Sequence, residues 1–195
     1  MIGVTGLSWT KSYPDCSGVY CMNWEENSQM SPKSLNLIIN RLINNLKRDV
    51  LIQRQLYDIR EHLDVDRIVL YYFYRKWKGQ VIAESLKSQD LSILGSTGAE
   101  DCFNQEYGEL YEAGRVKATP DIELEAIHEC HRDFLRSINV RANLVVPVIL
   151  PDGSGLWGLL IAHQCSGPRF WTQADIDFLW LESQKMLMSP VIIAR

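Results

Sequence analysis

The chain has 195 residues, of which 46% are hydrophobic, and a formal net charge of −4. This size and apolar content suit one domain with a single sizeable core and argue against a second full domain. The sequence contains no run of lysine or arginine, which argues against a protein that binds nucleic acid or an anionic membrane surface. It also has no stretch of about 18 uninterrupted apolar residues and no N-terminus in which an apolar run follows basic residues. We therefore expect no membrane span and no signal peptide, and predict a cytoplasmic protein.

Residues 1–30 are polar and irregular, and we interpret them as an N-terminal extension to which the sequence assigns no role. Ser31-Pro32 predicts a helix start, because serine caps the first amides and proline suits the first helical position. From there apolar residues recur at helical steps as far as Leu63, which predicts one long amphipathic helix or two helices in line. Two shorter helices packed back on one core are the alternative. A helix this long has more apolar surface than one small sheet can cover, so we expect part of it to contact a partner subunit.

The segments Arg67–Tyr74 and Gln80–Leu86 are rich in β-branched and aromatic residues. They flank a turn sequence at 76–79, which predicts a β-hairpin. Residues 88–98 carry glycines without a period and predict a loop.

Two helical segments come next, at 103–114 and 121–138. Ala142–Leu150 and Leu156–Gln164 then flank a turn rich in glycine and predict a second hairpin. Within it, Pro147 indicates a bulge or an edge position, because proline cannot donate a hydrogen bond to a neighbouring strand.

A last helix follows Thr172, which caps it. The order helix, hairpin, helices, hairpin, helix predicts an α+β domain around an antiparallel sheet. We assign residues 31–195 to this single domain, with a long N-terminal helix and a C-terminal helix.

The first candidate for chemistry is the pair Cys130-His131. Five cysteines in a reducing compartment predict free thiols rather than a disulfide framework. A thiol is nucleophilic only as the thiolate, and a neighbouring imidazolium or a helix terminus lowers its pKa. Cys130 is therefore a candidate covalent anchor beside a pocket. A buried structural cysteine next to an exposed histidine is the alternative.

The second candidate is His163. Alternation along a strand places it on the same face as Trp157 and Leu159, with the small Gly158 on the other face, where a bulky group could approach. A histidine among apolar residues needs a hydrogen-bond partner, so a satisfied core histidine is the alternative. Its expected position opposite Cys130-His131 favours a pocket between them.

Other chemistries find little support. The set of His128, Cys130, His131, His163 and Cys165 is rich in metal ligands, but no C-x2-C pair occurs, which argues against zinc. No dinucleotide, P-loop, nucleophile-elbow or zinc-protease motif is present. We therefore predict a protein that is not an enzyme.

Several segments together resemble the GAF domains of cyanobacteriochromes, small bilin-binding photoreceptor modules related to phytochromes. The resemblance runs from about Asp66 to Gln184. It implies a GAF fold, with a central antiparallel sheet of about six strands and helices on both faces. The segments that carry it are Glu100-Asp-Cys-Phe103, Gly114-Arg-Val-Lys-Ala118, Cys130-His131, Val140–Pro147 and Leu156–Arg169.

The resemblance implies a covalently bound linear tetrapyrrole, phycocyanobilin or phycoviolobilin. Cys130 would hold its A ring by a thioether, and His131 would lie against the pyrrole nitrogens. His163 would sit near the D ring or a propionate. Further cofactor contacts are expected from Phe103 and Tyr107 and, for the propionates and from charge alone, from Arg115 and Arg141.

One subgroup of this family has a second cysteine in an Asp-x-Cys-Phe motif, matched here by Cys102. In that subgroup the thiol adds reversibly to the bridge between the middle rings. Addition divides the conjugated system and shifts absorption to the blue, and isomerisation next to the D ring strains the bond. Here Glu100 replaces the aspartate of the motif, and its extra methylene changes which ring nitrogens the carboxylate reaches.

The resemblance thus implies a light-sensing module that switches between two coloured states. Its output would pass through the terminal helices to a second subunit or a signalling partner. The alternatives are a free methionine-R-sulfoxide reductase, which is also a compact GAF protein that uses thiols, and a GAF dimerisation module without bilin.

Overall fold

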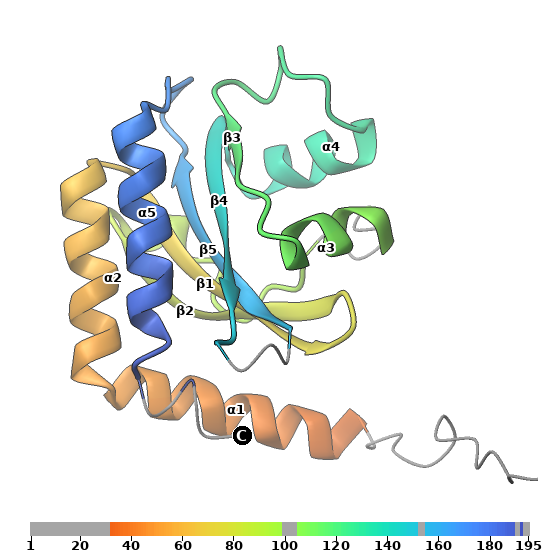
Figure 1. Cartoon of the computed structure of the whole chain (residues 1–195), viewed down its shortest axis with the longest axis vertical. Coiled ribbons are helices and arrows are strands. Elements are labelled where there is room, and N and C mark those ends of the chain that lie inside the picture. The colour runs from red at the N-terminus through yellow and green to blue at the C-terminus, as the bar shows by residue number, and fades with distance from the viewer. Residues whose placement is uncertain (1–31, 99–104, 152–154, 190–191, 193–195) are drawn as a thin grey trace, which may run out of the picture.

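A computed structural model describes residues 32–98, 105–151, 155–189 and 192. Five strands form one antiparallel sheet in the order β2-β1-β5-β4-β3 (Figure 1). This confirms the α+β prediction, with five strands against the expected six or so. The strands are β1 (Arg67–Arg75), β2 (Lys78–Leu86), β3 (Lys117–Thr119), β4 (Ala142–Ile149) and β5 (Leu156–Gln164).

Helices cover both faces of this sheet, as expected. On one face α2 (Val50–Leu63) and α5 (Gln173–Met186) lie side by side (Figure 1). Their apolar side chains meet alternate residues of the central strands in the main hydrophobic core. Core members with no measurable exposure include Leu56, Ile68, Leu144, Leu160 and Leu179.

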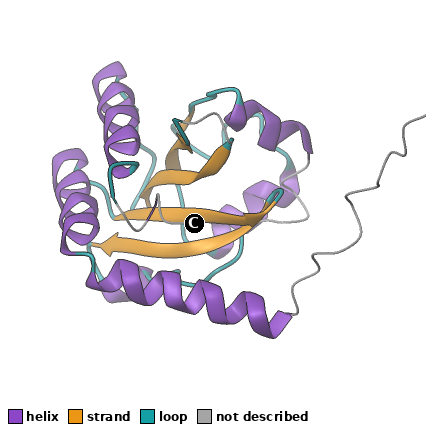
Figure 2. Ribbon diagram, turned by 60° about the horizontal axis from the view of Figure 1, so that its bottom comes forward, coloured by secondary structure: helices purple, strands orange, loops and turns teal. Residues whose placement is uncertain are grey.

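The N-terminal helical segment divides at Asp49. The Asp49 side chain accepts hydrogen bonds from the amides of Leu51 (3.0 Å) and Ile52 (3.2 Å), which caps α2 and ends α1 (Pro32–Arg48). The first helix therefore runs at an angle to α2 beside the sheet (Figure 2). Its Leu42 packs against the same core cluster, so the alternative of two shorter helices on one core is confirmed.

The opposite face of the sheet is covered by two short helices, α3 (Gln105–Glu112) and α4 (Glu129–Ser137). The prediction of a helix from 121 to 138 is wrong for its first half, because the helix begins only at Glu129. A single turn, η1 (Gln89–Leu91), interrupts the expected loop after β2. Among the helices of the described residues, none combines the length and apolar character needed to cross a bilayer.

Two details of the second hairpin qualify the sequence analysis. Strand β3 pairs with β4 only as far as Val145, so among the described residues no strand pairs with Pro147 on that side, which confirms an edge position. A Cβ on Gly158 would lie 2.1 Å from the carbonyl oxygen of Tyr71. Gly158 thus permits close contact with strand β1 rather than with a bulky ligand.

Trp157 packs with the ring of Tyr72 (4.9 Å between centroids), away from His163, because the register shifts near the start of β5.

Candidate functional site

A cavity lies between the sheet and the α3 and α4 helices. Its free space, open mouth and adjoining solvent included, is about 1260 Å³. The floor is apolar, and its residues belong to a second hydrophobic cluster. Members of that cluster in the cavity wall are Val69, Tyr71, Val81, Tyr111, Val145 and Leu159.

A row of four buried polar residues crosses this apolar floor from strand to strand. Arg67 pairs with His163, His163 with Asn143, and Asn143 with Thr119. Directly opposed residues of antiparallel strands share one face of the sheet. Their exposed fractions are only 1%, 3%, 5% and 2% in that order. His163, Asn143 and Thr119 line the cavity, so its mostly apolar floor also carries polar groups.

Arg67 fixes the protonation of His163. Its Nε donates a 3.0 Å hydrogen bond to Nδ1 of His163, and its terminal nitrogens donate to the carbonyl oxygens of Leu91 and Ile138. Because Nδ1 is an acceptor, the proton of the neutral ring is on Nε2. Burial, and then the charge of Arg67, holds the pKa of His163 well below its ordinary value. His163 is therefore a neutral hydrogen-bond donor in the wall of the cavity. The alternative of a core histidine with its hydrogen bonds satisfied holds for Nδ1, which Arg67 contacts, but not for Nε2.

The α4 helix supplies the facing wall. His128 caps it, because its Nδ1 accepts a 3.3 Å hydrogen bond from the amide of Cys130. His131, in the first turn, lines the cavity beside Phe134, whose ring stacks on it at 6.4 Å. Burial lowers the pKa of His131. The expected position of His131 and His163 on two walls of one pocket is thus observed.

Cys130 lies in the same first turn but is exposed, and the residues that line the cavity do not include it. In the structure its sulfur is engaged in a disulfide, whereas Cys165 is a free thiol whose pKa is raised by burial. The prediction of free thiols is therefore wrong for Cys130 and confirmed for Cys165. In the described part of the chain no group of three or more His, Cys, Asp and Glu side chains is placed to hold a metal ion.

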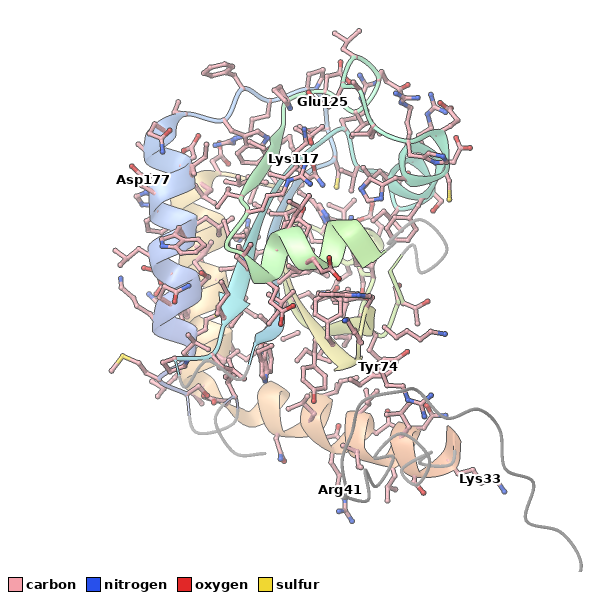
Figure 3. The ribbon with its side chains drawn as sticks, turned by 45° about the vertical axis from the view of Figure 1, so that its right-hand side comes forward. Lys33, Arg41, Tyr74, Lys117, Glu125 and Asp177 are labelled. Atoms are coloured by element: carbon pink, nitrogen blue, oxygen red, sulfur yellow. The ribbon has the colours of Figure 1, made fainter. Side chains whose placement is uncertain are left out.

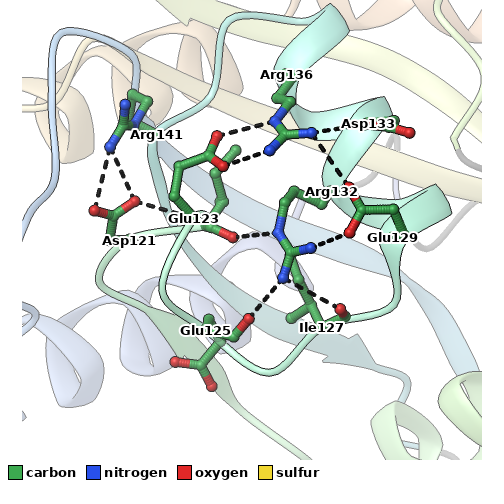
Figure 4. A network of polar contacts seen from close by, with 10 residues as sticks. Asp121, Glu123, Glu125, Ile127, Glu129, Arg132, Asp133, Arg136 and Arg141 are labelled. Carbon is green, nitrogen blue, oxygen red and sulfur yellow. Dashed lines mark hydrogen bonds and ion pairs between the residues drawn. The ribbon is translucent and has the colours of Figure 1, made fainter.

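Arg132 explains why residues 121–128 form a loop instead of a helix. Its guanidinium donates to the backbone carbonyls of Ile122 (2.8 Å), Glu125 (3.0 Å) and Ile127 (3.5 Å), and it also pairs with Glu129 (Figure 4). Carbonyls that accept from a side chain are not available to a helix ladder. The loop thereby forms the wall of the cavity next to His131.

Basic side chains lie near the same loop. Arg115 and Lys117 line the cavity, and Lys117 forms a 2.5 Å ion pair with Glu125 (Figure 3). Arg141 instead donates to both carboxylate oxygens of Asp121, at 3.0 and 3.2 Å, and does not line the cavity. Of the two arginines nominated for propionates, Arg115 is thus the one that borders the cavity.

The remaining candidates are not tested by the structure. Glu100, Cys102 and Phe103 lie outside the described residues, and Tyr107 belongs to α3, with its side chain outside the description. The sequence analysis missed Arg67, Lys117 and Asn143. A charged or amide residue in a predicted apolar strand was the available signal for Arg67 and Asn143, whereas Lys117 begins the three-residue strand β3 and had no such signal.

Comparison with known proteins places these features in a family. The family model "GAF domain" matches residues 47–182. An uncharacterised protein of Picosynechococcus sp. (strain PCC 7002) is 47% identical over 157 residues, which cover 80% of this chain and 95% of that protein. A candidate methyl-accepting chemotaxis protein of Synechocystis sp. is 42% identical over 74% of this chain, which spans only 14% of that protein. Among solved structures, the blue-light absorbing form of the Thermosynechococcus elongatus PixJ GAF domain is 32% identical, with a TM-score of 0.63, over 85% of this chain and 89% of that chain.

Proposed function

The chain belongs to the GAF domain family, and on that premise we propose that it is a light-sensing module that covalently binds a linear tetrapyrrole. The observation that carries the proposal is the cavity, which is mostly apolar and bordered by His131 and His163 from two walls. A flat conjugated ligand buries its rings against such aromatic and aliphatic surface. The similarity to the PixJ domain supports the same assignment.

In this proposal each residue of the site has a separate task. Cys130 is the covalent anchor, and its disulfide has to be reduced before its sulfur can react. His131 contacts the pyrrole nitrogens, which its burial in the wall suits. Arg115 binds a propionate, and Lys117 binds one on leaving its ion pair with Glu125, because among the described residues these are the lysine and arginine side chains that line the cavity.

The bound tetrapyrrole would supply the photochemistry, isomerisation of the bridge next to its D ring between two coloured states. We propose that the thiol of Cys102 adds reversibly to the bilin and so defines the colour of one state. Glu100 would orient ring N–H groups with its carboxylate.

The signal would leave through the terminal helices. Apolar side chains remain exposed at the junction of α1 and α2, where Val50 and Leu51 are 76% and 74% exposed, and on Met188 after α5, which is 80% exposed. Exposed apolar surface of this kind favours association. We propose that a second copy or a signalling partner covers these helices.

Expression together with bilin-synthesis enzymes, under reducing conditions, tests the proposal. The expected result is a coloured protein whose band fluoresces with zinc on a denaturing gel, which disappears in Cys130→Ala and persists in the matched variant Cys165→Ala. A colourless protein that reduces methionine sulfoxide would support the reductase instead. A folded protein that is both colourless and inactive would identify a bilin-free GAF module.

A further inference from the structure

His128 supplies the hydrogen-bond acceptors for the start of α4. Its ring Nδ1 accepts a 3.3 Å hydrogen bond from the amide of Cys130, and its carbonyl oxygen accepts from the amides of His131 and Arg132, both at 3.0 Å. The first amides of an α-helix have no partner within the helix, so a side chain before it has to accept from one of them. The turn that carries Cys130 and His131 therefore depends on this one residue.

The cap on α4 exists only while the imidazole of His128 is neutral. A neutral imidazole has one nitrogen that accepts and one that donates, whereas a protonated ring donates from both. Protonation thus removes the acceptor for the Cys130 amide, and it also places a positive charge at the positive end of the helix dipole. His128 lines the cavity and is also exposed, so solvent protons reach its ring.

The loop before His128 is held by different contacts. The guanidinium of Arg132 donates to three carbonyl oxygens of residues 122–127, and none of these hydrogen bonds involves the imidazole (Figure 4). The α4 helix has only nine residues, and helices this short are marginal by themselves. Loss of the cap should therefore loosen residues 129–131 and leave the loop in place.

We propose that His128 is a positioning residue for Cys130 and makes attachment of the pigment sensitive to pH. With the imidazole neutral, the capped turn fixes Cys130 beside His131, which lines the cavity. With the imidazole protonated, the turn frays and attachment slows. The attachment itself is an addition: the sulfur bonds to a carbon of the pigment, the proton of the thiol passes to the pigment, and no group leaves. The inference rests on the proposed function in that Cys130 is the anchor.

Other titratable groups lie near His128, and the test has to separate them. On the same helix, Glu129 pairs with Arg132. Burial lowers the pKa of His131 and of His163, so both rings stay neutral to a lower pH than an ordinary imidazole. A comparison of variants at each pH removes the effect of these groups, because every variant contains them. Among the described residues, the other titratable side chains that line the cavity are Tyr71, Tyr111, Arg115, Lys117, His131 and His163.

The test uses two matched variants of the reduced full chain. His128→Asn keeps an acceptor at every pH, because asparagine is a preferred N-cap and does not titrate, whereas His128→Ala has no acceptor at any pH. The chemical shift and solvent exchange of the Cys130 amide, measured by NMR without ligand between about pH 8 and pH 5, report the cap itself. The rate of adduct formation with phycocyanobilin, from zinc fluorescence on a denaturing gel, reports attachment.

At pH 8 we expect the wild type and His128→Asn to form the adduct at similar rates, and His128→Ala to form it about fivefold more slowly, the ratio to which the usual stabilisation by an N-cap corresponds. Toward pH 5 the wild type should approach the alanine variant. The ratio of the asparagine to the alanine variant should stay constant, because the thiol of Cys130 ionises alike in both. The Cys130 amide should lose its protection over the same pH range in the wild type alone.

A ratio of wild type to His128→Asn that does not change with pH would overturn the proposal. Attachment in His128→Ala that is as fast as in the wild type at pH 8 would overturn it too, as would a Cys130 amide that responds to pH while attachment does not. If the amide titrates as expected but no variant forms an adduct, the proposed function fails and the cap that depends on pH is retained. If all variants form the adduct at equal rates, the proposed function stands and the role of His128 is rejected.

Discussion

Nδ1 of His163 accepts a 3.0 Å hydrogen bond from Nε of Arg67, a residue 96 positions earlier in the chain. This contact joins two strands of the sheet and leaves the proton of the neutral imidazole on Nε2. It also places a guanidinium in the interior, with an exposed fraction of 1%. Buried charges of this kind are tolerated where their donors are satisfied.

Replacing Arg67 should therefore lower the free energy of unfolding substantially. Arg67→Met leaves the carbonyls of Leu91 and Ile138 and the ring nitrogen of His163 without their donor. We expect a loss of about 3 kcal/mol or more in the free energy of unfolding by urea. The control is Arg54→Met, which breaks an exposed pair with Asp58 and should cost less than about 1 kcal/mol. Equal losses in the two variants would show that the buried contacts are not what stabilises the sheet.

His163 should make stability depend on pH. Its pKa lies well below 6.5 in the folded protein through burial and the charge of Arg67, while an unfolded imidazole titrates near 6.5. Below about pH 6.5 the unfolded chain binds a proton that the folded one does not, so stability falls as the pH decreases, by up to about 1.4 kcal/mol per pH unit. Above about pH 6.5 the imidazole of His163 is neutral in both the folded and the unfolded state, so it makes no pH-dependent contribution to stability. His131, whose pKa is also lowered by burial, adds an effect of the same sign.

The measurement for this prediction is urea unfolding at a series of pH values from neutral to acidic. His163→Gln should reduce the slope below about pH 6.5. A slope that His163→Gln leaves unchanged would contradict a neutral, buried imidazole at this position.

Replacing Arg132 should destabilise the protein more than replacing Arg136, although both residues lie on α4. Arg132→Met removes the donor that holds three backbone carbonyls of the loop, so we expect a loss of about 2 kcal/mol or more and faster hydrogen exchange in residues 121–127. Arg136 forms exposed pairs with Glu123 and Asp133, and Arg136→Met should cost less than about 1 kcal/mol. The loop interpretation fails if exchange in 121–127 is the same in both variants.

Attachment of bilin should require a reductant. A thiol reductant supplies two electrons and two protons to the disulfide of Cys130 and releases its thiol. Purified, oxidised protein mixed with bilin should give a covalent adduct only after such treatment, as measured by zinc fluorescence on a denaturing gel. Cys165→Ser should behave as the wild type, since Cys165 is already a free thiol. Equal yields with and without reductant would contradict the requirement.

Cys102 should control colour rather than attachment. In a coloured protein, Cys102→Ala should remove a blue- or violet-absorbing state and leave the adduct on the gel unchanged, because only the second bond interrupts conjugation. Glu100→Asp, which restores the family motif, is the companion variant and should keep that state. Absorption spectra before and after illumination distinguish these outcomes, and an unchanged spectrum in Cys102→Ala would reject the dual-cysteine hypothesis.

The sequence was sufficient for the architecture because that depends on local patterns. Both hairpins and the capped helix after Thr172 follow from alternation, turn residues and a capping box that the structure contains. Strand β3 could not be predicted, since it has three residues and is defined by its pairing with β4. The loop at 121–128 was missed because the side chain of Arg132, which lies beyond it, satisfies its carbonyls.

The site was less accessible to prediction than the fold. His131 and His163 could be nominated from strand and helix periodicity, and both line the cavity. The roles of Arg67 and Asn143 depend on cross-strand register, which joins residues far apart in the sequence. Arg141 was nominated from charge alone, and charge could not reveal that Asp121 already pairs with it.

The most direct test of the account is mass spectrometry of tryptic peptides from the reduced protein after expression with bilin-synthesis enzymes. The account predicts a bilin adduct on the peptide Ala118–Arg132, at Cys130, in the wild type and in Cys165→Ala. An unmodified Ala118–Arg132 peptide, or a thioether adduct on a different cysteine with Cys130 intact, would contradict it.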